Sequence, residues 1–371
     1  MEKKHFKGMD RRTFLKAAGI GAAATIGAPA VLSAQSGQET MKKSPTEKID
    51  MFPHILPMKY KEALFKKAKS SFYLKADEIR PALWDLDLIF SSMDKYEGLR
   101  QTLTLSAPPV EYAFSPKEAV GMARLANDEM AELVNKYPDR FVAAAAALPL
   151  NDPDASIREI ERAVTELKLK GIQIFTSING IPLDRPQFLG IFEKMAQYDL
   201  PIWLHPCRDE NVPDYPDEEY SKYTLSLPFG WPYQTTMAMA RLVYSGIMEK
   251  YPNLKVITHH CGAMVPYFTA RIQPPGQDGE VMKLSKPPLE YFKRFYGDTV
   301  LGMNVPALMC GYAFFGADHM LFGSDYPFPG GPKNYNKALG GAIKAVENMK
   351  ITAEEKAKIY SKNARRILKL A

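Results

Sequence analysis

Five polar residues that could take part in catalysis lie at the ends of short apolar segments. His54 and His205 each end one such segment. His259 and His260 end a third, and Asp325 directly follows a fourth. Short continuous apolar segments are typical of buried parallel strands, and the carboxyl ends of parallel strands form one face of an α/β barrel, where catalytic groups collect. We therefore expect the ends of these four segments to lie together at that face.

Imidazoles and a carboxylate, with one position left open for water, suit a divalent metal ion that activates water or polarises a substrate. We expect one ion per chain, with zinc as the first choice and manganese as the alternative. Taken singly, Asp325 can cap the following turn, and His205 can bind a buried carbonyl group. Their shared position at strand ends favours the metal site.

The segments that carry these residues alternate with helical patterns from residue 48 onward. This alternation is typical of an α/β fold, and eight strands favour a closed (β/α)8 TIM barrel with a single catalytic domain over an open sheet. The predicted strands are 49–55, 100–105, 141–148, 171–176, 201–205, 254–260, 295–301 and 320–324. The long segment 208–233 is rich in Pro and Tyr, and we expect it to cover the site.

The beginning of the chain differs in kind from the rest. Arg11 and Arg12, followed by a weakly apolar segment, are similar to a twin-arginine export signal. We expect this signal peptide over residues 1–34, a polar linker over 35–47 and the barrel over 48–371. The folded protein would then lie in the periplasm, without stable insertion in the membrane.

The charge of the chain bears on its partners. Of the net charge of +6, residues 1–34 carry six Lys and Arg and two acidic residues, which leaves about +2 for the remainder. A weak charge without a basic stripe argues against nucleic acid as a partner. The three cysteines are too few for a disulfide framework, and Cys207 and Cys261 are either thiols packed near the site or a bridge. A homodimer is compatible with the sequence.

From residue 48 to its end, the chain resembles the amidohydrolase-related metal-dependent enzymes, which include aminocarboxymuconate semialdehyde decarboxylase and the resorcylate-type decarboxylases. The motifs that carry the resemblance are Ile49-Asp50-x-x-x-His54-Ile55-Leu56-Pro57, Leu204-His205-Pro206, His260-x-Gly262 with Arg271, and Gly323-Ser324-Asp325-Tyr326-Pro327. The resemblance implies a (β/α)8 barrel with His54, His205 and Asp325 as metal ligands. It also implies that His260 is the acid–base residue and that Arg271 binds a substrate carboxylate.

Three departures from the family pattern bear on the site. Phe52 stands where the family commonly has the first histidine of a His-x-His pair, so one ligand is missing. The fourth predicted strand ends at Phe175 and Thr176 without the lysine of a two-metal centre, which favours a single ion. The segment 88–94 lacks the arginines of the aminocarboxymuconate-type members, which disfavours that particular substrate.

The sequence leaves the roles of two aromatic residues open and constrains the orientation of the pair His259 and His260 only through strand alternation. Trp231 and Tyr326 either line a substrate pocket or pack at the rim of the barrel. Adjacent residues of a strand face opposite sides. We therefore expect His260 to face the interior and His259 to face the barrel wall.

The predicted function is that of a metal-dependent carboxy-lyase, a non-oxidative decarboxylase of a small aromatic or unsaturated carboxylic acid. His260 and Asp325 are the predicted catalytic residues. The alternative is a metal-dependent hydrolase of a lactone, amide or ester, because the same groups can pass a proton to a leaving group. A third hypothesis is a barrel that binds a small molecule without catalysis, and the intact polar residues at the strand ends argue against it.

Overall fold

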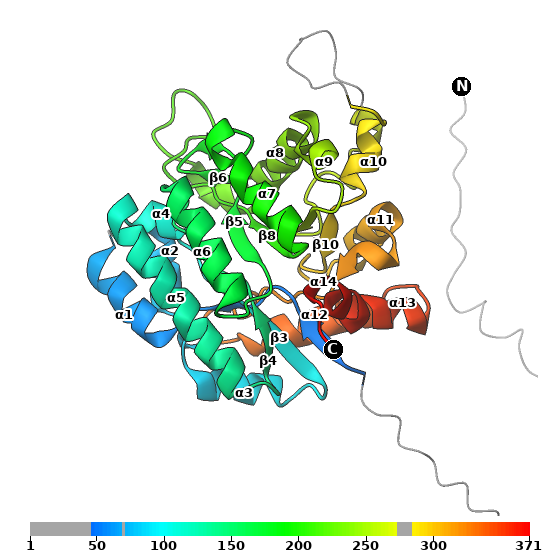
Figure 1. Cartoon of the computed structure of the whole chain (residues 1–371). Helices are drawn as coiled ribbons and strands as arrows, with labels where there is room; N and C mark the ends of the chain where they lie inside the picture. Colours follow the sequence, from blue (N-terminus) through cyan, green and yellow to red (C-terminus); the bar gives the residue numbers. More distant parts are fainter. Residues whose placement is uncertain (1–45, 69–70, 273–283) are drawn as a thin grey trace, which may run out of the picture. The chain divides into compact units, whose positions relative to one another are not determined.

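Eight strand positions, separated by helices, follow one another in the part of the chain that the structure describes. This computed structural model describes residues 46–68, 71–272 and 284–371 (Figure 1). The predicted export signal, and the linker as far as residue 45, lie outside the described residues. The strands are β1 (Lys48–Asp50) with its continuation β2 (His54–Ile55), β3 (Leu99–Leu105), β4 (Phe141–Ala144), β5 (Ile172–Phe175), β8 (Pro201–His205), β9 (Lys255–Thr258), β10 (Tyr296–Asp298) and β11 (Met320–Leu321).

Hydrogen bonds between neighbouring strands close the sheet. β1 and β2 pair with β3, which pairs with β4, and β5, β8, β9, β10 and β11 pair in that order, all in parallel. A bridge between Ala146 and Ile172 joins the two sets. At the opposite seam, Met51 N donates to Phe322 O over 2.8 Å. The predicted (β/α)8 barrel is confirmed, and the small antiparallel pair β6 (Ser177–Ile178) and β7 (Ile181–Pro182) lies beside it.

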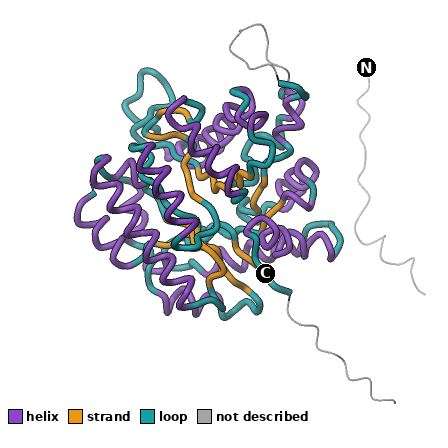
Figure 2. Tube along the Cα trace, in the orientation of Figure 1, coloured by secondary structure: helices purple, strands orange, loops and turns teal. Residues whose placement is uncertain are grey.

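Helices surround the strands, as the purple segments around the orange ones show in Figure 2. In α6, Asp152 accepts the N–H of Ala155 and caps the helix, and its apolar face buries Ile160 and Ala163. Among the described residues, no helix is both long and apolar enough to span a membrane. The helices are α1 (Met58–Lys67), α2 (Phe72–Glu78), α3 (Leu86–Met93), α4 (Val110–Ala113), α5 (Pro116–Lys136), α6 (Pro153–Thr165), α7 (Leu189–Tyr198), α8 (Trp231–Tyr244), α9 (Ile247–Lys250), α10 (Pro288–Phe292), α11 (Val305–Phe315), α12 (Asn336–Glu347), α13 (Ala353–Ala357) and α14 (Asn363–Leu368).

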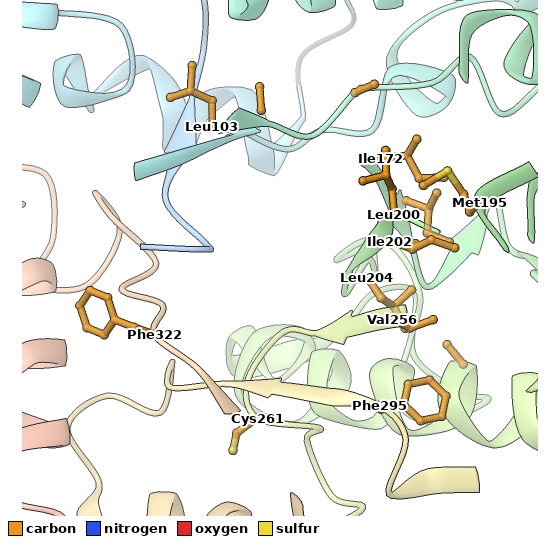
Figure 3. Packing of buried hydrophobic residues seen from close by; sticks show 14 of the residues in the cluster. Leu103, Ile172, Met195, Leu200, Ile202, Leu204, Val256, Cys261, Phe295 and Phe322 are labelled. Carbon is orange, nitrogen blue, oxygen red and sulfur yellow. The ribbon is translucent and has the colours of Figure 1, made fainter. Parts of the chain in front are cut away.

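Strand alternation divides the apolar core into two parts. Ile202, Leu204 and Val256 point outward and pack in the layer between strands and helices (Figure 3). Trp203 and Ile257 belong to a second cluster, which fills the interior of the barrel. A strand residue two positions beyond an inward-facing one also faces inward. This parity directs the side chains at the ends of β8 and β9 into the site.

Candidate metal centre and substrate cavity

Three imidazoles and one carboxylate gather at the carboxyl ends of the strands. His54 Nε2 lies 3.2 Å from Asp325 Oδ1, and His259 Nε2 lies 3.5 Å from the same oxygen. Ligand atoms of His54, His205 and His259 lie within 4.8 Å of one another, as do those of His259, His260 and Asp325. The structure therefore brings His54, His205, His260 and Asp325 together as expected, and His259 lies with them.

The local backbone positions each of these groups. His205 is the last residue of β8, and its Nδ1 donates to Pro206 O over 2.7 Å, which leaves Nε2 free to act as a ligand. Asp325 has a φ of +58° in the turn after β11, and its N–H donates to Phe52 O over 3.0 Å. Asp50 holds the start of this turn, because its carboxylate accepts hydrogen bonds from the N–H and the hydroxyl of Ser324.

Burial and charge set the protonation of the cluster. Burial, reinforced by the neighbouring imidazoles, holds the pKa of His205 well below its usual range, so that this imidazole is neutral. Burial next to His259 also lowers the pKa of His260, to about 4. Burial alone would raise the pKa of Asp325, but the adjacent imidazoles of His259 and His54 hold it below its usual range. Burial opposes the positive charge on His259, but Asp298 and Asp325 outweigh it and raise its pKa to about 9.

These donors fit a divalent ion. Ligands about 2.0–2.2 Å from a tetrahedral ion lie about 3.3–3.6 Å from one another, close to the separations of Asp325 from His54 and His259. Zinc and manganese bind neutral imidazoles and ionised carboxylates, so an ion here would displace the proton that Asp298 and Asp325 favour on His259. A buried imidazole nitrogen without a hydrogen bond is costly, and within the described residues His259 Nε2 is such an atom. A metal ion would satisfy it.

A cavity of about 420 Å³ opens onto the cluster. His54, His205, His260 and Asp325 line it, together with Trp231. The other residues that line it are Phe72, Tyr73, Ala76, Asp77, Arg80, Ala107, Leu227, Pro228 and Phe328. Its volume lies within the range of about 300–1,000 Å³ that is typical of small-molecule sites, and its walls are largely aromatic.

Two charged residues of this cavity, Asp77 and Arg80, were not identified from the sequence. Asp77 lies on α2, and Arg80 follows two residues after the helix ends. Ser106 Oγ donates to Asp77 Oδ1 over 3.3 Å, while Oδ2 has no hydrogen-bond partner among the described residues. Burial raises the pKa of Asp77 well above its usual range, although Ser106 and Arg80 oppose the shift. The Arg80 guanidinium lies 5.0 Å from the centre of the Phe328 ring.

Residues 54–370 match the model of the family described as amidohydrolase. The chain belongs to the amidohydrolase family. The gamma-resorcylate decarboxylase of Polaromonas sp. is 31% identical over 310 residues, which cover 79% of this chain and 90% of that protein. The 2-amino-3-carboxymuconate-6-semialdehyde decarboxylase of Dictyostelium discoideum is 28% identical to this chain. The match covers 83% of this chain and 88% of that protein.

A solved structure extends the similarity to three dimensions. The crystal structure of a dihydroxybenzoic acid decarboxylase from Polaromonas sp., with bound manganese and the inhibitor 2-nitroresorcinol, has a TM-score of 0.73. It is 28% identical to this chain, and the match covers 88% of this chain and 97% of the neighbour. The resemblance inferred from the strand-end motifs is confirmed, and so is the barrel that it implies.

Two of the predicted substrate contacts of this amidohydrolase lie away from the cavity. Arg271 ends a 3₁₀ turn, Thr269–Arg271, and contributes to a separate surface pocket with Tyr233 and Phe268. Tyr326 is buried, and its hydroxyl donates to Ser92 Oγ over 3.2 Å. Neither residue is among the described residues that line the cavity, whereas Trp231 is. The packing interpretation therefore fits Tyr326, and carboxylate binding by Arg271 stays a prediction.

The expectation that His259 faces the barrel wall is wrong. Ile257 packs in the interior cluster, so His259, two residues further on, also faces inward. It is fully buried, and its ring stacks on that of His205 with 4.9 Å between the ring centres. β9 ends at Thr258, and His260 has a φ of +59°, so strand alternation no longer applies to His260. Both histidines therefore reach the site.

The cysteines take the first of the two roles left open by the sequence. Cys207, Cys261 and Cys310 all lie within the described residues and are free thiols. Cys261 is buried beside the site, and its N–H donates to Asp298 Oδ1 over 2.9 Å. Cys207 lies 3.7 Å from the Tyr73 hydroxyl, next to the cavity. No bridge joins Cys207 to Cys261.

Proposed function

We propose that this amidohydrolase is a metal-dependent, non-oxidative decarboxylase of a small aromatic carboxylic acid. The observation that carries the proposal is one aromatic-walled cavity that contains the metal-ligand cluster, the neutral imidazole of His260 and the guanidinium of Arg80. The relatives and the structural neighbour described above are decarboxylases of carboxylic acids, most of them aromatic, which supports the same reaction class.

The cavity is suited to a flat, negatively charged substrate. Trp231 and Phe328 provide faces against which an aromatic ring can stack. Arg80 is the only Lys or Arg among the described residues that line the cavity, and a guanidinium binds a carboxylate through two parallel hydrogen bonds. Burial favours the neutral form of the Asp77 carboxyl group, and in that form it can donate a hydrogen bond to a substrate hydroxyl or carbonyl group. The substrate class that we propose is therefore the hydroxybenzoic acids.

The residues of the cavity can move the proton that decarboxylation requires. A bound divalent ion would supply Lewis acidity toward a substrate oxygen. His260 accepts a proton from the substrate hydroxyl or from water in the cavity and delivers it to the ring carbon that bears the carboxylate. The bond to the carboxylate carbon then breaks, its electron pair returns to the ring and carbon dioxide leaves. Asp325 stays ionised and stabilises the positive charge that His260 carries in transit.

We also propose zinc as the native ion, because three imidazoles dominate the cluster. Manganese is the alternative, and the Polaromonas neighbour contains it. Elemental analysis of protein purified without added metal will identify the ion. Activity restored by zinc but not by manganese after chelation would support the first choice.

The reaction class is tested with the purified metal-loaded protein. Hydroxybenzoic acids are incubated with it in D2O, and carbon dioxide and the deuterium at the vacated ring carbon are measured. We expect one equivalent of each, together with no turnover of lactones, amides or esters. Hydrolysis of those compounds without carbon dioxide release would instead establish the hydrolase. Stoichiometric binding of a carboxylate without any turnover would establish the binding barrel.

A further inference from the structure

We propose that Asp77 and Glu111 form a route that supplies protons from the surface to the cavity, with the Tyr60 hydroxyl and ordered water between them. The inference rests on the proposed function. Decarboxylation of a carboxylate consumes one proton per turnover, because the ring carbon gains a hydrogen while neutral carbon dioxide leaves. When His260 takes this proton from a substrate hydroxyl or from water, an anionic oxygen stays behind in the cavity. A proton from the solvent must reach that oxygen before the next turnover.

The first observation is a group of unpaired polar atoms next to the cavity. Tyr60 Oη, Asp77 Oδ2 and Glu111 Oε1 are buried, and none of them has a hydrogen-bond partner within the described residues. Burial raises the pKa of Tyr60, and the negative charges that Glu111 and Asp77 can carry raise it further, so both carboxyl groups lie close to this hydroxyl. Unpaired buried polar atoms are costly, and a group of them is a typical site for ordered water.

The second observation is that the two carboxyl groups connect the cavity with the surface. Asp77 lines the cavity, and Ser106 Oγ donates to its Oδ1 over 3.3 Å. At the other end, the backbone oxygen of Glu111 accepts from the side-chain amides of Asn151 and Asn179 over 3.3 and 3.0 Å. Asn179 is exposed. A proton that enters near Glu111 therefore crosses only the region around Tyr60 to reach Asp77.

The third observation is the protonation of the groups in this region. Burial raises the pKa of Glu111 to about 8, so that it carries a proton at neutral pH, and burial also favours the neutral form of Asp77. Arg80 opposes the shift at Asp77, and it would stabilise the carboxylate that forms when Asp77 gives up its proton. Cys207 is the other titratable group close to Glu111. Burial raises the pKa of its thiol to about 12, and both it and the Tyr60 hydroxyl stay neutral.

The transfers along this route balance. Asp77 donates its proton to the anionic oxygen that remains in the cavity after carbon dioxide has left. Glu111 then donates its proton to the Asp77 carboxylate through the Tyr60 hydroxyl, which can accept one hydrogen bond while it donates another. The Glu111 carboxylate takes a proton from the solvent. Both carboxyl groups return to their first state, and one solvent proton has been consumed.

A structural role of Glu111 is the competing interpretation, because this residue lies in the first turn of α4. An acidic residue there can stabilise a helix as a carboxylate that accepts backbone N–H groups, and such hydrogen bonds lower the pKa of the carboxyl group. In Glu111 burial outweighs the opposing hydrogen bond to its own backbone and raises the pKa. α4 has only four residues, and Glu111 Oε1 accepts no hydrogen bond within the described residues. These features favour proton transfer over capping.

The kinetic test uses the metal-loaded full-length protein and the hydroxybenzoic acid that it decarboxylates fastest. General acid–base groups contribute about 10²–10⁴-fold, and water can partly replace a relay, so Glu111→Gln should lower kcat by about 10-fold. The solvent deuterium isotope effect on kcat should rise in this variant, because proton supply becomes rate-limiting. In the wild type, kcat should fall as the pH rises through about 8, where Glu111 loses its proton. Glu111→Gln should lack this decline, and Glu111→Asp should keep it.

Glu129→Gln is the matched control for structural effects in the same region. The Glu129 side chain is buried, and it accepts the N–H groups of Lys59 and Tyr60 at the start of α1 over 3.0 and 2.7 Å. This variant should lose stability and keep the wild-type isotope effect and pH profile. The same rise in isotope effect in Glu129→Gln as in Glu111→Gln would show that the change is structural and would overturn the inference.

Infrared difference spectra test the route without turnover. The wild-type protein at pH 7 should show the carbonyl stretch of a protonated carboxyl group, shifted in D2O and absent from Glu111→Gln. Absence of this band from the wild type would overturn the inference. Wild-type kcat and isotope effect in Glu111→Gln, with carbon dioxide still released, would also overturn it and would leave the proposed function intact. If the wild type released no carbon dioxide from any hydroxybenzoic acid, the proposed function would fail, and this inference with it.

Discussion

His54 Nε2 lies 3.2 Å from Asp325 Oδ1, a contact that joins the first and last strand positions of the barrel. Two ligand atoms this close share an ion readily, so Asp325 should be essential for binding it. We expect Asp325→Ala to lose both the ion and activity, while the wild-type protein holds about one ion per chain. Elemental analysis after gel filtration will measure the stoichiometry. Retention of a full equivalent of metal by Asp325→Ala would remove Asp325 from the ligand set.

The acid–base assignment of His260 gives a second prediction. General acid–base groups contribute about 10²–10⁴-fold to rate, so His260→Ala should lower kcat by about that factor while the metal stays bound. His319 is a suitable control, because its ring stacks on Tyr296, with 4.5 Å between the ring centres, away from the cavity. His319→Ala should leave kcat and metal content close to those of the wild type. A similar loss of kcat in both variants would show that the effect of His260→Ala is structural.

Carboxylate recognition by Arg80 is the third prediction. A hydrogen bond to a charged group contributes about 1.5–3 kcal/mol, so Arg80→Met should raise KM for a hydroxybenzoate by about 10- to 100-fold. Arg80→Lys keeps the charge but not the paired donors, and its KM should lie between those of the wild type and Arg80→Met. Arg271→Met is the matched control, since Arg271 lies at a separate pocket. An increase in KM with Arg271→Met alone would restore the role that the family resemblance assigns to that residue.

The site residues at the ends of strands could be predicted from the sequence. The charged residues that a helix and its following loop contribute to the cavity could not. His54, His205 and Asp325 each end or follow an apolar segment. Parallel strands that close a barrel bring such ends together, and this does not depend on the conformation of the loops. Asp77 and Arg80 come from the helical insertion between β2 and β3. In a sequence, a charged helical residue that lines a cavity cannot be distinguished from one that faces solvent. The sequence does not show which helix packs over the cavity.

To predict the orientation of His259, one must know which residues of β9 face the interior of the barrel. Val256 and Ile257 are both apolar, so the sequence alone did not distinguish the inward from the outward residue. In the structure Trp203 and Ile257 pack together inside the barrel, and this fixes the parity for His205 and His259 alike. The left-handed backbone of His260 then breaks the alternation. No sequence pattern signalled that turn, because left-handed conformations at residues other than glycine are held by tertiary contacts.

Export remains a prediction from the first residues of the chain. Arg11 and Arg12 resemble the arginine pair of a twin-arginine signal, and such a signal directs a protein to the periplasm. We expect the wild-type protein in the periplasmic fraction of a host with this export route, shortened by removal of the signal peptide. Changing both arginines to lysine should leave the protein in the cytoplasm at its full length. Periplasmic accumulation of that variant would show that export does not use this pair.

Glu111 on α4 gives a prediction about stability and pH. The side chain is buried, and within the described residues its Oε1 has no hydrogen-bond partner. Burial raises the pKa of Glu111 from 4.5 to about 8. Between these two values the folded protein binds a proton that the unfolded chain has released. The free energy of unfolding therefore falls as the pH rises from about 4.5 to 8, since each unit of difference in pKa corresponds to about 1.4 kcal/mol.

Replacing the ionisable group removes this pH dependence. Glu111→Gln keeps the size of the side chain and carries no charge, so its stability should decline less steeply over the same interval. At pH 8 it should exceed that of the wild type by about 1–3 kcal/mol, the cost of a buried polar group without a partner. Urea unfolding at several pH values between 5 and 8.5 will measure the difference. Glu62→Gln, at an exposed position of α1, is the control and should follow the wild type throughout. If the curves for Glu111→Gln and the wild type ran parallel across this interval, Glu111 would be ionised in the folded protein, and another buried acid would cause the decline.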